Sequence, residues 1–210
     1  MKLLDLLFDR RCAVCDDPIK SGAVCSHCDE ILVSAAVRRI RVIESDDMYA
    51  EALYLFDYEN ETARKLLFAL KRFSNKELMK YAASLYERVV PEDFCGIVVN
   101  CPRGKSAIRE YGFDQVAEPC KIMCKNSGGR LKYENALKRR GFSRQQKKLS
   151  LAERKNNTYG KFMTVKKDIR ENILLTDDVV TTGNTAFECV RELKKSNPGA
   201  NITLAFLASR

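Results

Sequence analysis

The fold of this chain is decided by one stretch of its sequence, Ile173-Leu174-Leu175-Thr176-Asp177-Asp178-Val179-Val180-Thr181-Thr182-Gly183-Asn184-Thr185. Its first four residues suit a buried parallel strand, and residues 177–185 are expected to form a polar loop. Apolar residues then recur at helical spacing, at Ala186, Val190 and Leu193. Residues 202–208 follow as a further strand. This order predicts a β-loop-α-β unit, the building block of an open parallel sheet whose ligands bind beyond the carboxyl ends of the strands.

The middle of the chain extends the same pattern. Apolar residues are spaced as in helices from Tyr58 to Arg88, with a break at Ser74-Asn75. Residues 95–101 read as a buried strand, and residues 114–125 as another helix. We therefore expect an α/β domain with a parallel sheet and flanking helices.

The polar loop has the features of a phosphate site. Gly183 permits a tight turn, the threonine hydroxyls can donate hydrogen bonds, and N–H groups point outward at the start of the next helix. The loop lacks the lysine of a Walker-type P-loop, and one glycine does not make a dinucleotide fingerprint.

The two aspartates of this loop need a separate explanation. Asp177 and Asp178 would repel an anion, so they serve another part of a ligand, such as a ribose diol, with Mg²⁺ bound nearby. The residues alone leave open a simpler alternative, in which the aspartates start a turn and Thr185 caps the helix.

Four clustered cysteines point to a metal site. Cys12 and Cys15 form one C-x2-C knuckle and Cys25 and Cys28 another, separated by a nine-residue gap. Four thiolates at this spacing favour structural zinc, with redox pairs or an iron–sulfur site as the alternatives. A polar break near residue 45 suggests a zinc ribbon-like segment over residues 1–45 and a second domain over 46–210. One metal site among nine cysteines suits a reducing compartment, so we expect a cytoplasmic protein.

The positive charge is concentrated in one region. The chain of 210 residues has a net charge of +9, and residues 101–155 hold 15 Lys+Arg against 5 Asp+Glu. Such a region calls for an anionic partner, such as pyrophosphate or nucleic acid, unless it is a plain solvated loop. The sequence has no run of eighteen apolar residues, so we expect no membrane insertion.

The stretch 177–185 resembles the phosphoribosyl-pyrophosphate (PRPP) loop of type I phosphoribosyltransferases. The whole chain resembles a narrower group, the ComF family of competence-related, phosphoribosyltransferase-like proteins with an amino-terminal zinc ribbon. Besides the loop and the cysteines, the resemblance rests on Lys71 ahead of Ser74-Asn75, on Tyr111-Gly112-Phe113-Asp114-Gln115, and on Arg139-x3-Ser143-x2-Gln146-x2-Leu149-x4-Arg154-x2-Asn157. The chain departs from the family pattern at Tyr111, Asp114 and Ser143, where the family has Arg, Asn and Thr.

The resemblance implies a fold, a ligand and a set of site residues. The fold is a type I phosphoribosyltransferase-like parallel sheet with flanking helices, and the ligand is PRPP with magnesium. Asp177 and Asp178 are then the catalytic residues that hold the ribose hydroxyls. The 5′-phosphate is held by Thr181, Thr182, Gly183, Asn184 and Thr185. The pyrophosphate is held by Arg103, Lys105, Arg139 and Arg154, the last two in a basic loop that closes over the site.

Two functions are compatible with this resemblance. In the first, the protein transfers phosphoribose from PRPP to an unknown acceptor. In the second, it is a non-enzymatic component of DNA uptake that binds single-stranded DNA through the basic loop and works with a competence helicase.

Overall fold

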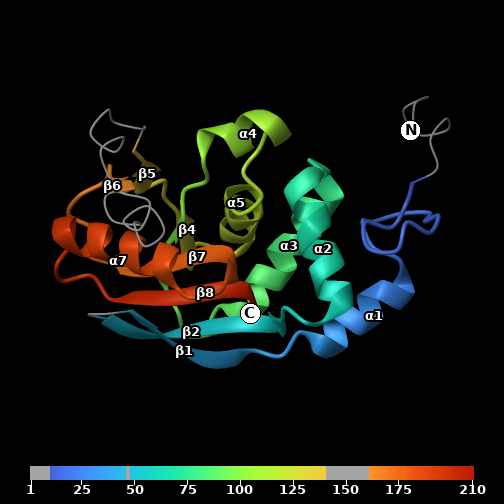
Figure 1. Ribbon diagram of the computed structural model, residues 1–210, viewed down its shortest axis with the longest axis horizontal. Helices are drawn as coiled ribbons and strands as arrows, with labels where there is room; N and C mark the ends of the chain where they lie inside the picture. Colours follow the sequence, from blue (N-terminus) through green and yellow to red (C-terminus); the bar gives the residue numbers. More distant parts are fainter. Residues whose placement is uncertain (1–9, 46–47, 141–160) are drawn as a thin grey trace, which may run out of the picture.

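A computed structural model describes residues 10–45, 48–140 and 161–210. Six strands form the central sheet in the order β1-β2-β8-β7-β3-β4 (Figure 1). Their bounds are β1 (Arg39–Ser45), β2 (Met48–Asp57), β3 (Gly96–Asn100), β4 (Leu131–Tyr133), β7 (Asn172–Val180) and β8 (Ile202–Ser209). Every neighbouring pair is parallel except β1 and β2, which are antiparallel. A separate antiparallel ribbon consists of β5 (Leu137–Arg139) and β6 (Phe162–Thr164).

Helices cover both faces of the sheet. They are α1 (Ser26–Ala35), α2 (Glu61–Arg72), α3 (Lys76–Val89), α4 (Lys105–Tyr111), α5 (Ala117–Asn126) and α7 (Asn184–Ser196). Side chains alternate along β7, so that Leu174 joins the core under α2, α3 and α5, while Ile173 and Leu175 join the core under α7. The predicted α/β class, with a mostly parallel sheet and flanking helices, is therefore confirmed.

The expected break between the two central helices is also confirmed. Asn60 Oδ1 accepts a hydrogen bond from the N–H of Ala63 at 3.0 Å and caps α2. Asn75 Oδ1 accepts one from the N–H of Glu77 at 2.8 Å and caps α3. Each asparagine satisfies donors that the first turn of a helix leaves unpaired, so the chain starts a new helix at each.

The topology places a switch point between β3 and β7. The chain leaves β3 through α4 and α5 to reach β4 on one side, whereas it leaves β7 through α7 to reach β8 on the other side. Neighbouring parallel strands whose connections diverge in this way open a ligand site beyond their carboxyl ends. Residues 100–105 and 177–185 follow or end these two strands, so the candidate residues lie at that edge.

The expected polar loop at residues 177–185 is shorter than the sequence suggested. β7 continues to Val180, and Asp177, Val179 and Val180 pair with residues of β8. The pairing of β7 with β3 ends at Thr176, but its pairing with β8 continues and carries the strand past the aspartates despite their polarity. Only residues 181–183 remain between β7 and α7.

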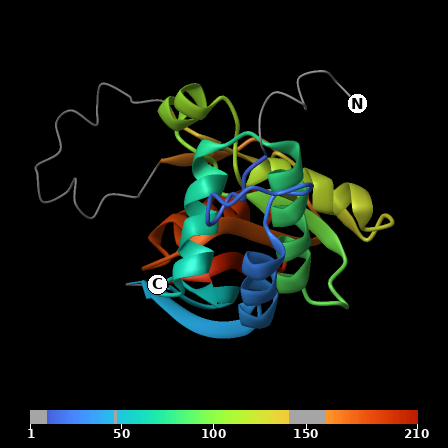
Figure 2. The same ribbon diagram turned by 90° about the vertical axis from the view of Figure 1, so that its right-hand side faces the viewer.

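The cysteine-bearing segment lies across α2 and α3 (Figure 2). The Tyr81 hydroxyl of α3 donates to Asp29 Oδ1 of α1 at 2.8 Å, and the Arg38 guanidinium donates to the carbonyl of Val90 at 2.9 Å. The division of the chain at residue 45 stays a prediction. β1 lies before that residue and forms one edge of the central sheet. Across the described residues, no helix is long and apolar enough to span a membrane.

We expect Gly96→Ala to destabilise the fold strongly. A Cβ at Gly96 would lie 2.2 Å from the carbonyl oxygen of Asn172, its partner on β7, so the two central strands would have to separate. The free energy of unfolding should fall by about 3 kcal/mol, measured by urea denaturation. Gly199→Ala is the control, because a Cβ there meets no atom within 4 Å. Equal denaturation midpoints for the two variants would contradict this account of the β3–β7 contact.

Candidate functional site

Asp178 is held in place from three directions at the end of β7. Its Oδ2 accepts a hydrogen bond from Gln115 Nε2 at 3.0 Å and lies 3.3 Å from the Lys71 ammonium of α2. Its Oδ1 accepts the N–H of Val179 at 2.8 Å. The side chain is 13% exposed, so the carboxylate is fixed but still accessible at the switch point. Lys71, on which part of the resemblance to the ComF family rests, thus lies at the acidic pair.

Asp177 has a different environment from its neighbour. Its Oδ1 accepts the N–H of Asp178 at 2.9 Å, and the Tyr86 hydroxyl donates to its main-chain carbonyl at 3.3 Å. Burial raises the pKa of Asp177 well above its usual range, and the nearby carboxylates of Asp178 and Asp114 raise it further, against the opposing effect of Lys71. A cation or a hydroxyl donor beside Asp177 would stabilise its ionised form.

The β3 side of the switch point is a chain of hydrogen bonds. The Tyr133 hydroxyl donates to Asn100 Oδ1 at 2.7 Å, and Asn100 Nδ2 donates to Asp114 Oδ2 at 3.3 Å. Asp114 Oδ1 accepts the N–H groups of Val116 and Ala117, both at 3.0 Å, at the start of α5. A carboxylate at position 114 thus offers two acceptor oxygens, and the second of them, Oδ2, pairs with the amide of Asn100.

The turn after β7 has the geometry of an anion cradle. A cavity of about 60 Å³ is lined by residues 179–186, Asp177 and Phe206. α7 begins at Asn184 with Gly183 as its N-cap. Among the described residues, no side chain makes a capping hydrogen bond to the first turn of this helix. The alternative in which Thr185 caps the helix is therefore wrong. The N–H groups of the first turn are left to an external acceptor.

Gly183 is required by both its backbone and its surroundings. Its φ is +78°, in the left-handed region that favours glycine. An added Cβ would lie 2.8 Å from Ile43 Cδ1 of β1 and 3.1 Å from the ring of Phe187. The turn is thus packed closely against the edge strand, and Thr181, Thr182, Asn184 and Thr185 remain exposed around it.

The predicted pyrophosphate residues differ in where the structure places them. Arg103 follows β3, with its guanidinium 5.9 Å from the centre of the Tyr111 ring and its buried Nη1 without a partner in the described residues. Lys105 is the first residue of α4. Arg139 lies in β5, 5.7 Å from the centre of the Phe162 ring. No hydrogen bond or ion pair in the described part joins Arg139 to the acidic pair. Arg154, like the rest of the basic loop over 141–155, lies outside the described residues.

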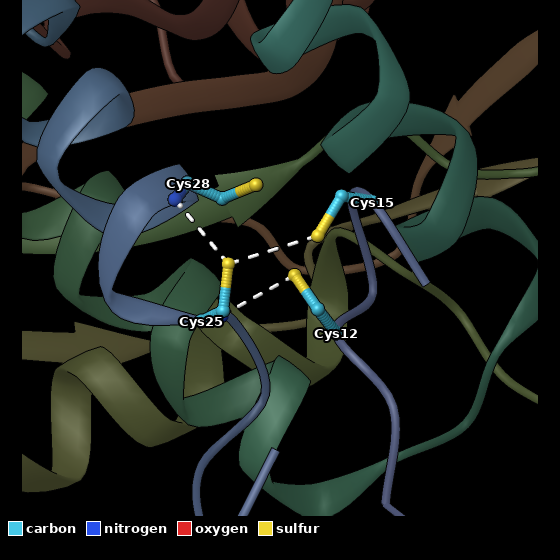
Figure 3. A group of neighbouring side chains, drawn as sticks. All are labelled: Cys12, Cys15, Cys25 and Cys28. Atoms are coloured by element: carbon cyan, nitrogen blue, oxygen red, sulfur yellow. Dashed lines mark hydrogen bonds between the residues drawn. The ribbon is translucent and has the colours of Figure 1, made fainter. Parts of the chain in front are cut away.

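The four predicted cysteines come together in one cluster (Figure 3). Their Sγ atoms all lie within 4.8 Å of one another, and those of Cys15 and Cys25 are 3.7 Å apart. A tetrahedral ion with Zn–S bonds of about 2.3 Å places its sulfurs about 3.8 Å apart, so the cluster fits zinc. Among described residues, these cysteines are the group of potential metal ligands that approach one another this closely.

Main-chain donors surround the buried sulfur of Cys12. Burial opposes ionisation of this thiol, but the N–H groups of Val14 and Cys25 donate to its Sγ at 3.4 and 3.3 Å. The net effect lowers the pKa of Cys12 to about 7. Main-chain donors from both knuckles therefore stabilise the thiolate of Cys12, the form in which it binds a metal.

Sequence reasoning gave no role to Asn100 and Gln115, two buried residues of the site. Asn100 is the last residue of β3, and its polarity after the apolar Ile97, Val98 and Val99 was a usable signal. Gln115 was part of a quoted motif, but only the fold shows that its amide reaches Asp178 on another strand.

Comparisons with known proteins give structural neighbours only. No protein-family model matches the chain, and no curated protein matches it in sequence. The UMP synthase of Leishmania donovani is 14% identical with a TM-score of 0.38, over 88% of this chain and 31% of that one. A hypoxanthine phosphoribosyltransferase from Staphylococcus aureus is 14% identical with a TM-score of 0.31, over 70% and 64%. The adenine phosphoribosyltransferase of Leishmania tarentolae is 11% identical with a TM-score of 0.33, over 87% of each chain. This chain therefore spans less than two thirds of the first two.

We expect the purified protein to carry about one equivalent of zinc, because four thiolates fill one tetrahedral shell. Cys28→Ser should lose the metal, as measured by elemental mass spectrometry. Cys124→Ser is the control, since Cys124 is a buried cysteine outside the cluster, and it should keep the zinc. Iron in place of zinc, or no metal in protein prepared without chelators, would contradict this assignment.

We expect opposite stability changes from the two aspartates. The raised pKa of Asp177 means that the folded state holds its proton more tightly than the unfolded chain. The stability gained in this way is fully present at pH values below the pKa of Asp177 in the unfolded chain. It is lost as the pH rises through the pKa of Asp177 in the folded state. Asp177→Asn, which cannot ionise, should therefore melt about 2–4 °C above the wild type at pH 8, with the gap closing toward pH 4.

Asp178→Asn is the matched comparison in the same melting experiment. It gives up a carboxylate that Lys71 and Gln115 both contact, so it should melt below the wild type at pH 8. Equal melting temperatures for the two variants at pH 8 would show that their environments do not differ as described.

Proposed function

We propose that this protein binds PRPP with Mg²⁺ at the β3–β7 switch point and transfers the phosphoribosyl group to an acceptor. The observation that carries the proposal is the adjacency of an acidic pair and an uncapped helix start. Asp177 and Asp178 lie near the carboxyl end of the central strand β7, and residues 181–185 follow that strand directly around a small cavity. A sugar phosphate is the ligand that needs both hydroxyl acceptors and a phosphate cradle.

The acidic pair has free acceptor capacity for a ribose diol. Asp177 Oδ2 has no hydrogen-bond partner within the described residues, and Asp178 has three donors for about four lone-pair sites. Hydroxyl groups that donate to these carboxylates make charge-assisted hydrogen bonds. The 5′-phosphate then lies over the N–H groups of the first turn of α7 and the exposed hydroxyls of Thr181, Thr182 and Thr185.

The charge at the switch point fits a divalent cation. Asp114, Asp177 and Asp178 lie near one another here, and the ammonium of Lys71 opposes their negative charge. Mg²⁺ prefers oxygen ligands of this kind. When bound with PRPP, Mg²⁺ supplies neutralisation of the pyrophosphate. Arg103 and Lys105 follow β3 and are proposed as the chain's own cations for that group, with Arg139 and Arg154 of the basic loop as further ones.

The proposed reaction is a substitution at the anomeric carbon of the ribose. The acceptor atom forms the new bond there, and the bond to the pyrophosphate oxygen breaks, so that pyrophosphate leaves with the electron pair. Asp177 and Asp178 orient the sugar, and the cations hold the leaving group where negative charge develops.

Membership of the ComF family and a cytoplasmic location belong to the same proposal, with zinc as the structural ion of the amino-terminal segment. The alternative, a DNA-uptake component that binds single-stranded DNA and a competence helicase, depends on the basic loop over residues 139–155. Because this loop lies outside the described residues from residue 141 onward, the alternative stays a prediction from the sequence.

The test is stabilisation of the protein by PRPP. A ligand at a hundred times its dissociation constant adds about 2.7 kcal/mol to stability, which should raise the melting temperature by about 5–10 °C for a chain of this size. The double variant Asp177→Asn with Asp178→Asn keeps the shape but loses the ionised acceptors, so it should keep its zinc and show little or no shift. A wild type that does not respond to saturating PRPP with Mg²⁺ would end the proposal.

A further inference from the structure

Gln115 connects the two halves of the switch point. It lies in the turn between α4 and α5, on the crossover from β3 to β4, and its Nε2 donates to Asp178 Oδ2 of β7 at 3.0 Å. The side chain of Gln115 is 3% exposed, so the donor end of this hydrogen bond is shielded from solvent. A partly buried hydrogen bond between a crossover connection and a central strand restrains their relative position more firmly than an exposed one.

The amide of Gln115 is held in one orientation. Its Oε1 is buried and has no partner in the described part of the chain. Turning the amide over would place that oxygen against the Asp178 carboxylate and lose the donated hydrogen bond. A buried acceptor without a partner costs about 1–3 kcal/mol, so the contact with Asp178 is kept in spite of an internal cost. Such a contact is more typical of a binding site than of a core.

The donors around Asp178 determine which of its lone pairs a ligand can use. Val179 donates to Oδ1, while Gln115 and Lys71 both act on Oδ2 from different elements. With both present, the carboxylate plane is fixed and one acceptor position is left. Without Gln115, only the half-exposed Lys71 would act on Oδ2, and the carboxylate could rotate toward it.

We propose that Gln115 is a positioning residue that aims the free acceptor of Asp178 at one ribose hydroxyl, and that it thereby sets the preference of the site for ribose over deoxyribose. This inference rests on the proposed function, because it concerns how the same site distinguishes ribose from deoxyribose. Gln115 acts through Asp178 and contacts no reacting atom.

The experiment uses three sugar phosphates that lack pyrophosphate. Ribose 5-phosphate, 2-deoxyribose 5-phosphate and 3-deoxyribose 5-phosphate are titrated into the full chain with Mg²⁺ by calorimetry. The wild type should bind ribose 5-phosphate more tightly than either deoxy sugar. In Gln115→Met, which keeps the volume but cannot donate, one of these two preferences should fall by about tenfold, as expected for the loss of one aimed, charge-assisted hydrogen bond.

Tyr133→Phe is the matched control. It removes a partly buried donor from the Asn100–Asp114 branch of the same edge, which has no hydrogen bond to Asp178 among the described residues. Both preferences should stay at the wild-type value, even if the protein is less stable. Lys71→Met removes the other donor to Oδ2 from an exposed position, so it should lower the same preference as Gln115→Met. It also serves as the test if Gln115→Met does not fold.

The outcomes separate this inference from the proposed function. If the wild type binds none of the three sugar phosphates and does not respond to PRPP, both fail. If it binds them without preference, or if Gln115→Met weakens all three equally, Gln115 is only a structural residue and PRPP binding can still stand. An unchanged preference in a folded Gln115→Met variant also overturns the inference.

Discussion

The parallel pairing of β7 with both β3 and β8 is the constraint on which the rest of the structure depends. It makes β7 a central strand, with Leu174 in one core and Ile173 and Leu175 in the other. The pairing with β3 ends at Thr176, and the pairing with β8 carries the strand on through Asp177 to Val180, so that two carboxylates lie near its carboxyl end. Their partial burial follows from the topology and raises the pKa of Asp177.

The site therefore contains groups whose placement lowers the stability of the fold. The acidic side chains of Asp114, Asp177 and Asp178 lie near one another, and polar atoms of Gln115, Arg103 and Thr176 are buried without a partner among the described residues. Elsewhere at this edge, Tyr133, Asn100 and Asp114 satisfy one another in a continuous chain. Such a contrast between satisfied and unsatisfied polar groups is typical of a surface shaped for a ligand.

Much of this arrangement could be predicted from the sequence. The parts that could not be predicted have one cause in common. The apolar run at 173–176, the helix break at Ser74-Asn75, and the spacing of the four cysteines are local patterns, and the structure confirms each. The length of β7 depended on β8, and the role of Gln115 depended on Asp178, about sixty residues further along the chain. Contacts set by tertiary packing leave no periodicity in the sequence.

The order of the elements along the chain has a consequence for biosynthesis. The cysteine knuckles lie near the amino terminus, whereas β7 and β8 are the last strands of the sheet. As the chain leaves the ribosome, the knuckles can take up metal while the places of β7 and β8 beside β2 and β3 are still unfilled. During that interval the hydrogen-bonding edges of β2 and β3 lack their neighbouring strands, so the nascent chain is exposed to aggregation until translation has supplied the last strands of the sheet.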